Sequence, residues 1–303
     1  MSSSFPIGVF DSGVGGLSVA KEFLKLLPNE PLLYFADTAH VPYGGRPLDE
    51  VQGFALAICD YLVGRGAKMI VMACNISSAV ALAPARERYP DIPVLGVIAP
   101  GVNAALHAGA RRIGVLATQG TVSSGAYSAT AAAIDSSVPV IENACPRFVP
   151  LVEAEETEST EALDAARTYL EPLARAGCDS IILGCTHYPF LLNALTREAK
   201  DLFPMDKQPV FIDPAGATVA AAGLILSEGG LCAPTGALTQ HRYCTSGERE
   251  KFAHQGPVFL GQPVTNVEHV DLARLNVAPA TRVLAFASKR RVSIFTNLRE
   301  DTD

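Results

Sequence analysis

The chain has little of several features that mark special classes of protein. Only seven of its 303 residues are cysteine and no CxxC pair occurs, which excludes a disulfide-stapled scaffold. Charged residues make up only 18% of the chain and hydrophobic residues 49%, so it is not a disordered protein. Lys and Arg are outnumbered by Asp and Glu, 24 to 31, and we therefore expect no nucleic-acid partner.

Signals for membrane insertion and secretion are also missing. The longest apolar run, 217–226, is interrupted by Thr218 and Gly223 and is shorter than the roughly 18 residues that cross a bilayer. The start of the sequence lacks a basic region followed by an apolar one. We therefore expect no membrane association and a cytoplasmic protein whose thiols are reduced and free.

Short apolar runs alternate with longer helical patterns along the chain. The runs are rich in β-branched residues and bounded by turn residues, as buried strands are. Helices are predicted between them, for example over 48–65 and 157–176. This alternation predicts an α/β fold of doubly wound parallel sheets. The predicted strands are 7–10, 32–35, 69–73, 94–98, 113–117, 180–183, 210–212 and a final one near 267–270.

The two halves of the chain echo each other. IGVFDS at 7–12 resembles IGVLAT at 113–118, and MIVMACN at 69–75 resembles SIILGCT at 180–186. The paired segments lie almost equally far apart, which indicates duplication. We expect two similar domains that face each other across an active-site cleft.

Ligands of open parallel sheets bind where strands end and helices begin, so these positions hold the candidate residues. Asp11 opens a glycine-rich loop, DSGVGG (11–16). The loop lacks the lysine of a phosphate-binding loop and the spacing of a dinucleotide-binding one. Taken alone, the loop is better explained as a simple strand-to-helix turn with Asp11 as the N-cap.

Cys74 and Cys185 end corresponding predicted strands of the two halves. One such cysteine would most simply be structural, but two at matching positions indicate a shared function. A helix N-terminus lowers the pKa of a thiol, and His187 is close enough in sequence to exchange a proton with Cys185. Two thiols on opposite faces of a carbon can remove one proton and add another, which inverts the centre. Zinc ligands usually lie closer together in sequence, so we predict no metal.

Several segments in a fixed order match the pattern of one known enzyme family. The strongest are FDSGVGGLSV (10–19), YFADTAHVPYG (34–44), ACNISSA (73–79), LATQGTVSSGAY (116–127), FVPLVE (148–153) and ILGCTHYPFL (182–191). FIDPAGATVA (211–220) and HRYCTSGEREKF (241–252) match more weakly. Over about residues 5–270 the chain thus resembles the glutamate racemase family of the cofactor-independent Asp/Glu racemase superfamily.

This resemblance implies interconversion of L- and D-glutamate, which supplies D-glutamate for peptidoglycan, without pyridoxal phosphate or any other cofactor. It implies that Cys74 and Cys185 are the catalytic acid/bases, assisted by Asp11, His187 and Glu153. A homodimer is a further expectation. The residues implied to bind substrate are Asp11, Ser12, Pro42, Tyr43, Gly44, Asn75, Ile76, Thr118, Thr121 and Thr186.

The resemblance also implies a discontinuous first domain. It would comprise residues 1–98 and 208–270, with a second domain over 99–207. Residues 271–303 would form a C-terminal extension without an assigned role.

The sequence departs from the family pattern directly after Cys74. The family usually reads Cys-Asn-Thr-Ala-Ser, whereas residues 74–78 read Cys-Asn-Ile-Ser-Ser. Ile76 lacks a carboxylate-binding hydroxyl, although its backbone N–H and the Ser77 hydroxyl could compensate. Aspartate or another acidic amino acid therefore remains an alternative substrate. A non-catalytic amino-acid-binding protein, or a degenerate enzyme with a regulatory surface in 271–303, remains an alternative of another class, against which the two retained thiols argue.

Overall fold

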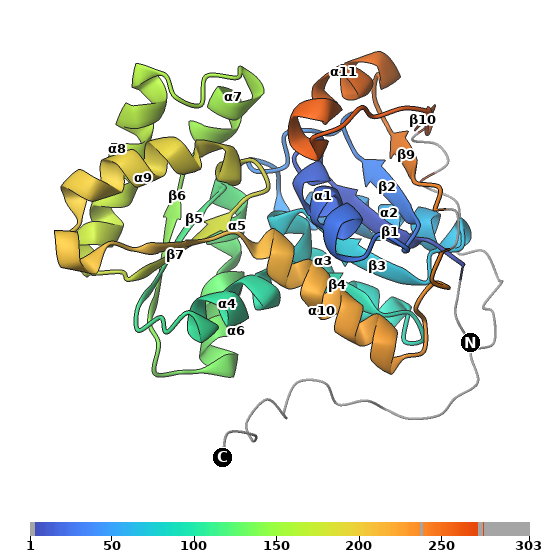
Figure 1. Ribbon diagram of the computed structural model, residues 1–303, viewed down its shortest axis with the longest axis horizontal. Helices are drawn as coiled ribbons and strands as arrows, with labels where there is room; N and C mark the ends of the chain where they lie inside the picture. Colours follow the sequence, from blue (N-terminus) through green and yellow to red (C-terminus); the bar gives the residue numbers. More distant parts are fainter. Residues whose placement is uncertain (1–3, 237–238, 272–274, 276–303) are drawn as a thin grey trace.

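The computed structural model describes residues 4–236, 239–271 and 275, and within them the chain forms two parallel sheets covered by helices (Figure 1). Every strand pair is parallel, which confirms the predicted α/β class. The first sheet has the order β10-β9-β2-β1-β3-β4 and the second β6-β5-β7-β8. The strands are β1 (Ile7–Asp11), β2 (Leu32–Ala36), β3 (Met69–Met72), β4 (Val94–Gly96), β5 (Ile113–Ala117), β6 (Val140–Ala144), β7 (Ser180–Gly184), β8 (Val210–Ile212), β9 (Arg242–Thr245) and β10 (Val267–His269).

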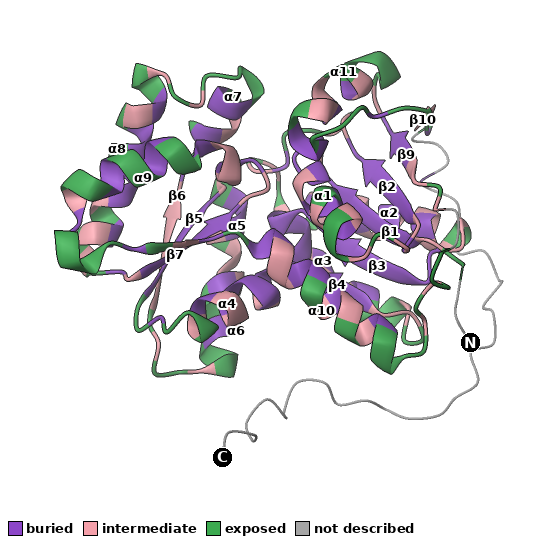
Figure 2. Ribbon diagram, in the orientation of Figure 1, coloured by how far each residue is buried: buried purple, intermediate pink, exposed green. Residues whose placement is uncertain are grey.

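Helices connect the strands and cover the sheets. As a result, every residue of β1, β2, β3, β5 and β7 is buried (Figure 2). No helix among the described residues has both the length and the apolarity to cross a membrane. The helices are α1 (Leu17–Leu26), α2 (Leu48–Gly64), α3 (Asn75–Arg88), α4 (Ile98–His107), α5 (Gln119–Ser124), α6 (Ala126–Ile134), α7 (Phe148–Glu153), α8 (Thr160–Ala176), α9 (Leu192–Leu202), α10 (Pro214–Glu228) and α11 (Arg249–Leu260), with 3-10 turns at Tyr188–Leu191 and Met205–Lys207.

The chain returns to the first sheet through α10. This helix follows β8, packs against α1 and α4, and lies at the junction of the two sheets (Figure 1). Strand β8 pairs with β7 of the second sheet, so the predicted boundary at residue 208 falls before the last strand of that sheet. The division into two domains stays a prediction. Because β8 ends at Ile212, the point at which the chain passes back to the first domain is better placed after that residue. Apart from residues 271 and 275, the predicted extension 271–303 lies outside the described residues.

All the predicted strands are present, and two further strands were not predicted. Strand β6 reads VIENA, is only half-buried and lies at an edge of its sheet, so its polar residues face partly toward solvent. Strand β9 reads RYCT and is too short and too polar to stand out as an apolar run. The missed strands matter for the site, because residues that follow β6 line its cavity and residues that follow β9 are hydrogen-bonded to the loop after β2.

Candidate active site

A cavity of about 350 Å³ lies where the carboxyl ends of the two sheets meet. This volume is within the usual range for a small-molecule site. Every residue that the sequence assigned to catalysis or substrate binding lines this one cavity. These residues are Asp11, Ser12, Pro42, Tyr43, Gly44, Cys74, Asn75, Ile76, Thr118, Thr121, Glu153, Cys185, Thr186 and His187.

Cys74 lies between the end of β3 and the first residue of α3, and its side chain lines the cavity. Burial raises the pKa of the Cys74 thiol to about 12, the charge of Asp11 adds to this rise, and hydrogen bonding from Ser77 opposes it. The sequence predicted a lowered pKa at this helix N-terminus, and for Cys74 that prediction is wrong. The cost of burying a thiolate outweighs the hydrogen bonding that the helix start provides.

Asp11 is the last residue of β1 and is almost completely buried. Burial raises the pKa of its carboxyl group, whereas the positive charge of His187 and backbone N–H groups of the following loop oppose the rise. One of these groups, Gly13 N–H, donates a hydrogen bond to Asp11 Oδ2 at 3.0 Å. The carboxylate therefore lies in a fixed orientation beside Cys74.

Cys185 directly follows β7 and is accompanied by a histidine and a glutamate. Cys185 Sγ is 3.9 Å from His187 Nδ1, and His187 Nε2 forms an ion pair with Glu153 Oε1 at 3.5 Å. Burial lowers the pKa of His187, but the contacts with Cys185 and Glu153 and the charge of Asp11 outweigh burial and raise it to about 10. The imidazole is thus protonated at neutral pH and can pass a proton to or from the sulfur.

Glycine in the 11–16 loop permits the two strand ends to approach each other. A Cβ atom on Gly15 would lie 2.4 Å from Thr186 Oγ1 and 2.6 Å from the His187 ring. The Thr186 hydroxyl in turn donates to Asp11 Oδ1 at 3.5 Å. The loop after β1 therefore packs directly on the segment after β7, which brings the groups around the two thiols into one site.

Polar groups from both domains complete the walls of the cavity. The hydroxyls of Thr118 and Thr121 lie 3.1 Å apart, and Gly120 N–H donates to Gly44 O at 2.9 Å, which joins the two domains. Tyr127 OH donates to Asn75 Oδ1 at 2.6 Å and so fixes the orientation of that amide. Hydroxyl and amide donors of this kind are suited to bind carboxylates.

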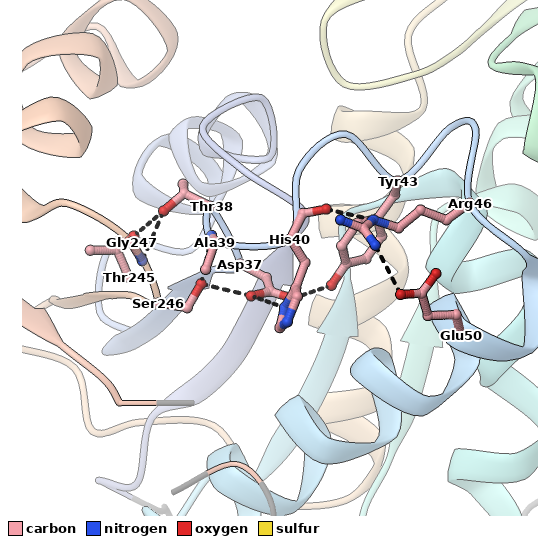
Figure 3. Close-up of polar contacts among 10 residues, drawn as sticks. All are labelled: Asp37, Thr38, Ala39, His40, Tyr43, Arg46, Glu50, Thr245, Ser246 and Gly247. Atoms are coloured by element: carbon pink, nitrogen blue, oxygen red, sulfur yellow. Dashed lines mark hydrogen bonds and ion pairs between the residues drawn. The ribbon is translucent and has the colours of Figure 1, made fainter. Parts of the chain in front are cut away.

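The Tyr43 ring lines the cavity, but its hydroxyl is used elsewhere. It donates to Asp37 Oδ2 at 2.5 Å, within a polar network that joins the loop after β2 to the residues after β9 (Figure 3). Burial and the charge of Asp37 raise the pKa of Tyr43 well above its usual range, so the phenol is neutral.

Sequence reasoning missed several residues of the cavity wall. Four of them, Cys145, Pro146, Val149 and Pro150, lie between the end of β6 and the middle of α7. These residues follow β6, which was not predicted. The expectation that ligand-binding residues lie directly after a strand therefore did not point to them. Among the described residues, no group of three or more His, Cys, Asp and Glu side chains is arranged to hold a metal ion.

Comparisons with known proteins agree with this geometry. The sequence model of the family Asp/Glu/Hydantoin racemase matches residues 7–222. The glutamate racemase of Acidothermus cellulolyticus is 44% identical over 266 residues, which cover 87% of this chain and 98% of that protein. That of Corynebacterium diphtheriae is 42% identical over 264 residues, covering 87% and 97%.

Solved structures give the same result. The glutamate racemase of Francisella tularensis, in complex with D-glutamate, superposes with a TM-score of 0.82 at 32% identity, covering 89% of this chain and 98% of that one. The enzyme from Thermus thermophilus, in complex with β-chloro-D-alanine, gives 0.79 at 40% identity, covering 90% and 100%.

Two parallel-sheet domains that join around a cavity with a thiol from each define a protein of the Asp/Glu racemase class. At this identity and coverage the chain belongs, within that class, to the glutamate racemase family, and it is an isomerase.

Proposed function

We propose that the chain interconverts L- and D-glutamate without a cofactor, by proton transfer between the substrate and two thiols. Cys74 and Cys185 act from opposite faces of the α-carbon. The observation that carries the proposal is their origin: they follow matching strands of two different sheets and line one cavity. The relatives support glutamate as the substrate, because the Francisella tularensis structure is a complex with D-glutamate.

Each turnover moves two protons. One sulfur, as thiolate, takes the α-proton, and the electron pair passes onto the α-carboxylate. The other sulfur, as thiol, then gives its proton to the opposite face of the carbon. After one turnover the thiol and the thiolate have changed places. This is the arrangement that the reverse reaction requires. Positioned general acids and bases contribute about 10²–10⁴ in rate each.

The two sulfurs have ionisable neighbours of opposite charge. Asp11 lies beside Cys74, where its negative charge raises the pKa of the thiol and favours the protonated form. His187 lies beside Cys185, with Glu153 holding the imidazole from the other side. This asymmetry favours a resting state in which Cys74 is the proton donor and a protonated His187 accompanies Cys185.

Carboxylate binding falls to neutral donors of the cavity wall. The hydroxyls of Thr118, Thr121 and Thr186 and the backbone N–H groups at the start of α3 are the candidates, since the Ile76 side chain supplies no donor. Charge develops on the α-carboxylate oxygens during proton removal, and a donor fixed there is worth about 10²–10³ in rate.

The D-glutamate is proposed to be used for peptidoglycan synthesis in the cytoplasm. The homodimer expected from the sequence stays a prediction.

Racemisation of D-glutamate with no added cofactor, followed by circular dichroism, tests the proposal. We expect activity in the wild type and its loss in both Cys74→Ser and Cys185→Ser. Cys232→Ser is the matched control, because this cysteine is exposed and does not line the cavity. Racemisation of D-aspartate but not D-glutamate would show that aspartate is the substrate and would leave the two-thiol mechanism unchanged. Inertness toward both would contradict the proposal and favour a binding protein.

A further inference from the structure

The loop between β2 and α2 carries five consecutive residues of the cavity wall: Val41, Pro42, Tyr43, Gly44 and Gly45. The same loop is tied to residues 245–247, some 200 positions later in the chain (Figure 3). Thr38 Oγ1 and Thr245 Oγ1 lie 2.6 Å apart, and Gly247 N–H donates to Thr38 Oγ1 at 3.1 Å. Residues 245–247 belong to the segment 241–252, which matches the family but was assigned no role by the sequence.

Asp37 is the centre of this contact. It is fully buried, and three side chains point at its carboxylate (Figure 3). Ser246 OH donates to Oδ1 at 2.6 Å, Tyr43 OH donates to Oδ2 at 2.5 Å, and His40 Nδ1 lies 2.9 Å from Oδ2. A buried carboxylate is stable only when donors of this kind surround it, so each donor fixes the position of the others.

The loop is held at further points. The His40 ring stacks on the Phe54 ring at 3.9 Å between centroids, and Arg46 Nε donates to His40 O at 2.8 Å. Ser246 has a second contact, because its hydroxyl accepts Ala39 N–H at 3.0 Å. Ser246 therefore holds both the carboxylate that orients Tyr43 and the backbone at the start of the loop, although Ser246 itself does not line the cavity.

We propose that Ser246 is a positioning residue, which acts through Asp37 to hold the Tyr43–Gly44 segment against the bound amino acid. The proposal rests on the proposed function and adds to it a residue that never touches the substrate. Loss of the Ser246 hydroxyl leaves Asp37 with fewer donors and Ala39 N–H without its acceptor, so the segment loses its fixed position. The two thiols follow β3 and β7, outside this network. Substrate binding should therefore suffer more than the chemical step.

Ser246→Ala tests the proposal, with Ser159→Ala as the matched control. Ser159 is the N-cap of α8, where its hydroxyl accepts Ala162 N–H at 3.1 Å, and it does not line the cavity. Both variants lose one hydroxyl and one backbone hydrogen bond. We expect the KM for glutamate to rise roughly tenfold in Ser246→Ala, as for loss of a hydrogen bond to a charged group, with kcat changed less than threefold. Ser159→Ala should keep the wild-type KM.

Tyr43→Phe supplies a second test of action through Asp37. If Ser246 acts by orienting Tyr43, the effects of Ser246→Ala and Tyr43→Phe on KM will be less than multiplicative in the double variant. Fully multiplicative effects would overturn the proposal. So would a wild-type KM in Ser246→Ala, or a loss of thermal stability alone.

Amide hydrogen exchange separates this inference from the proposed function, because it needs no substrate. Exchange at 38–46 should accelerate in Ser246→Ala and stay unchanged in Ser159→Ala, where α8 should exchange faster instead. Unchanged exchange at 38–46 in Ser246→Ala would overturn the anchoring role whatever the enzyme does. If the wild-type chain does not racemise glutamate, the proposed function is overturned. The exchange experiment then still tests whether Ser246 holds residues 38–46 in place.

Discussion

Substitution of Gly120 by alanine probes how closely the two domains approach at the cavity wall. Gly120 lies in α5 of the second domain, and Ile76 lies in α3 of the first and is almost completely buried. A Cβ atom on Gly120 would be 2.3 Å from Ile76 Cδ1 and 3.2 Å from Gly44 O. The isoleucine side chain thus fills the space that the glycine leaves, at the point where the family pattern would place a threonine.

The size of the effect follows from this geometry. Ordinary carbon contacts begin near 3.5 Å, so the 2.3 Å approach is about 1.2 Å too short and the Ile76 side chain must move. Overpacking of this kind costs about 1–3 kcal/mol. Ile76→Val deletes the clashing Cδ1 atom at a cost of about 0.5–1.5 kcal/mol. In that background Gly120→Ala should cost much less, because Ile76 Cγ1 would be an ordinary 3.5 Å from the new methyl group and only the 3.2 Å approach to Gly44 O would stay tight.

A double-mutant cycle measures this directly. Urea unfolding and the KM for glutamate would be determined for the wild type, both single variants and Ile76→Val/Gly120→Ala. We expect Gly120→Ala to lower stability and raise KM, and the second substitution to restore most of both, with a coupling energy of about 1–3 kcal/mol. If Gly120→Ala costs the same in both backgrounds, the two residues do not meet as described and the reasoning is refuted.

Three further predictions concern the groups around the thiols. The pKa of His187 is about 10 in the folded chain against 6.5 for an ordinary histidine, so the folded state holds more protons between these values. The stability that this proton contributes is complete below pH 6.5 and is lost as pH rises through 10, so the stability difference between wild type and His187→Gln should shrink across that window in urea titrations. Asp11→Asn should lower the pKa of the Cys74 thiol, because the charge of Asp11 adds to the rise that burial causes, and the pH dependence of alkylation at Cys74 should shift to lower pH than in the wild type. Gly15→Ala should reduce kcat/KM at least tenfold, since its Cβ would lie 2.6 Å from the His187 ring; an unaffected enzyme would show that the loop is not held there.

Most of the fold could be predicted because parallel strands covered on both faces are continuous apolar runs. Strand β6 was missed because it is a half-buried edge strand that carries Glu142 and Asn143. Helix α8 begins three residues later than the sequence suggested, since the Ser159 hydroxyl caps its first turn. The local pattern thus identified buried elements well and edges poorly.

Site residues could be predicted where they lie at the carboxyl end of a predicted strand or directly after it. Asp11, Cys74 and Cys185 were found from this rule, and the structure brings them to one cavity. The contact between Asp37 and Ser246 could not be predicted, since it joins residues 209 positions apart. The raised pKa of Cys74 could not be predicted either, because it depends on burial by segments from elsewhere in the chain.

The distribution of deuterium during the first few per cent of reaction in D₂O tests the two-thiol mechanism most directly. Starting from protiated D-glutamate, we predict that L-glutamate carries deuterium at the α-carbon in every molecule, because the proton is delivered by a second, solvent-equilibrated thiol. The unreacted D-glutamate should still carry protium. Protium at the α-carbon of the L-glutamate would mean that one group carries the same proton across the carbon, and would contradict the assignment of separate roles to Cys74 and Cys185.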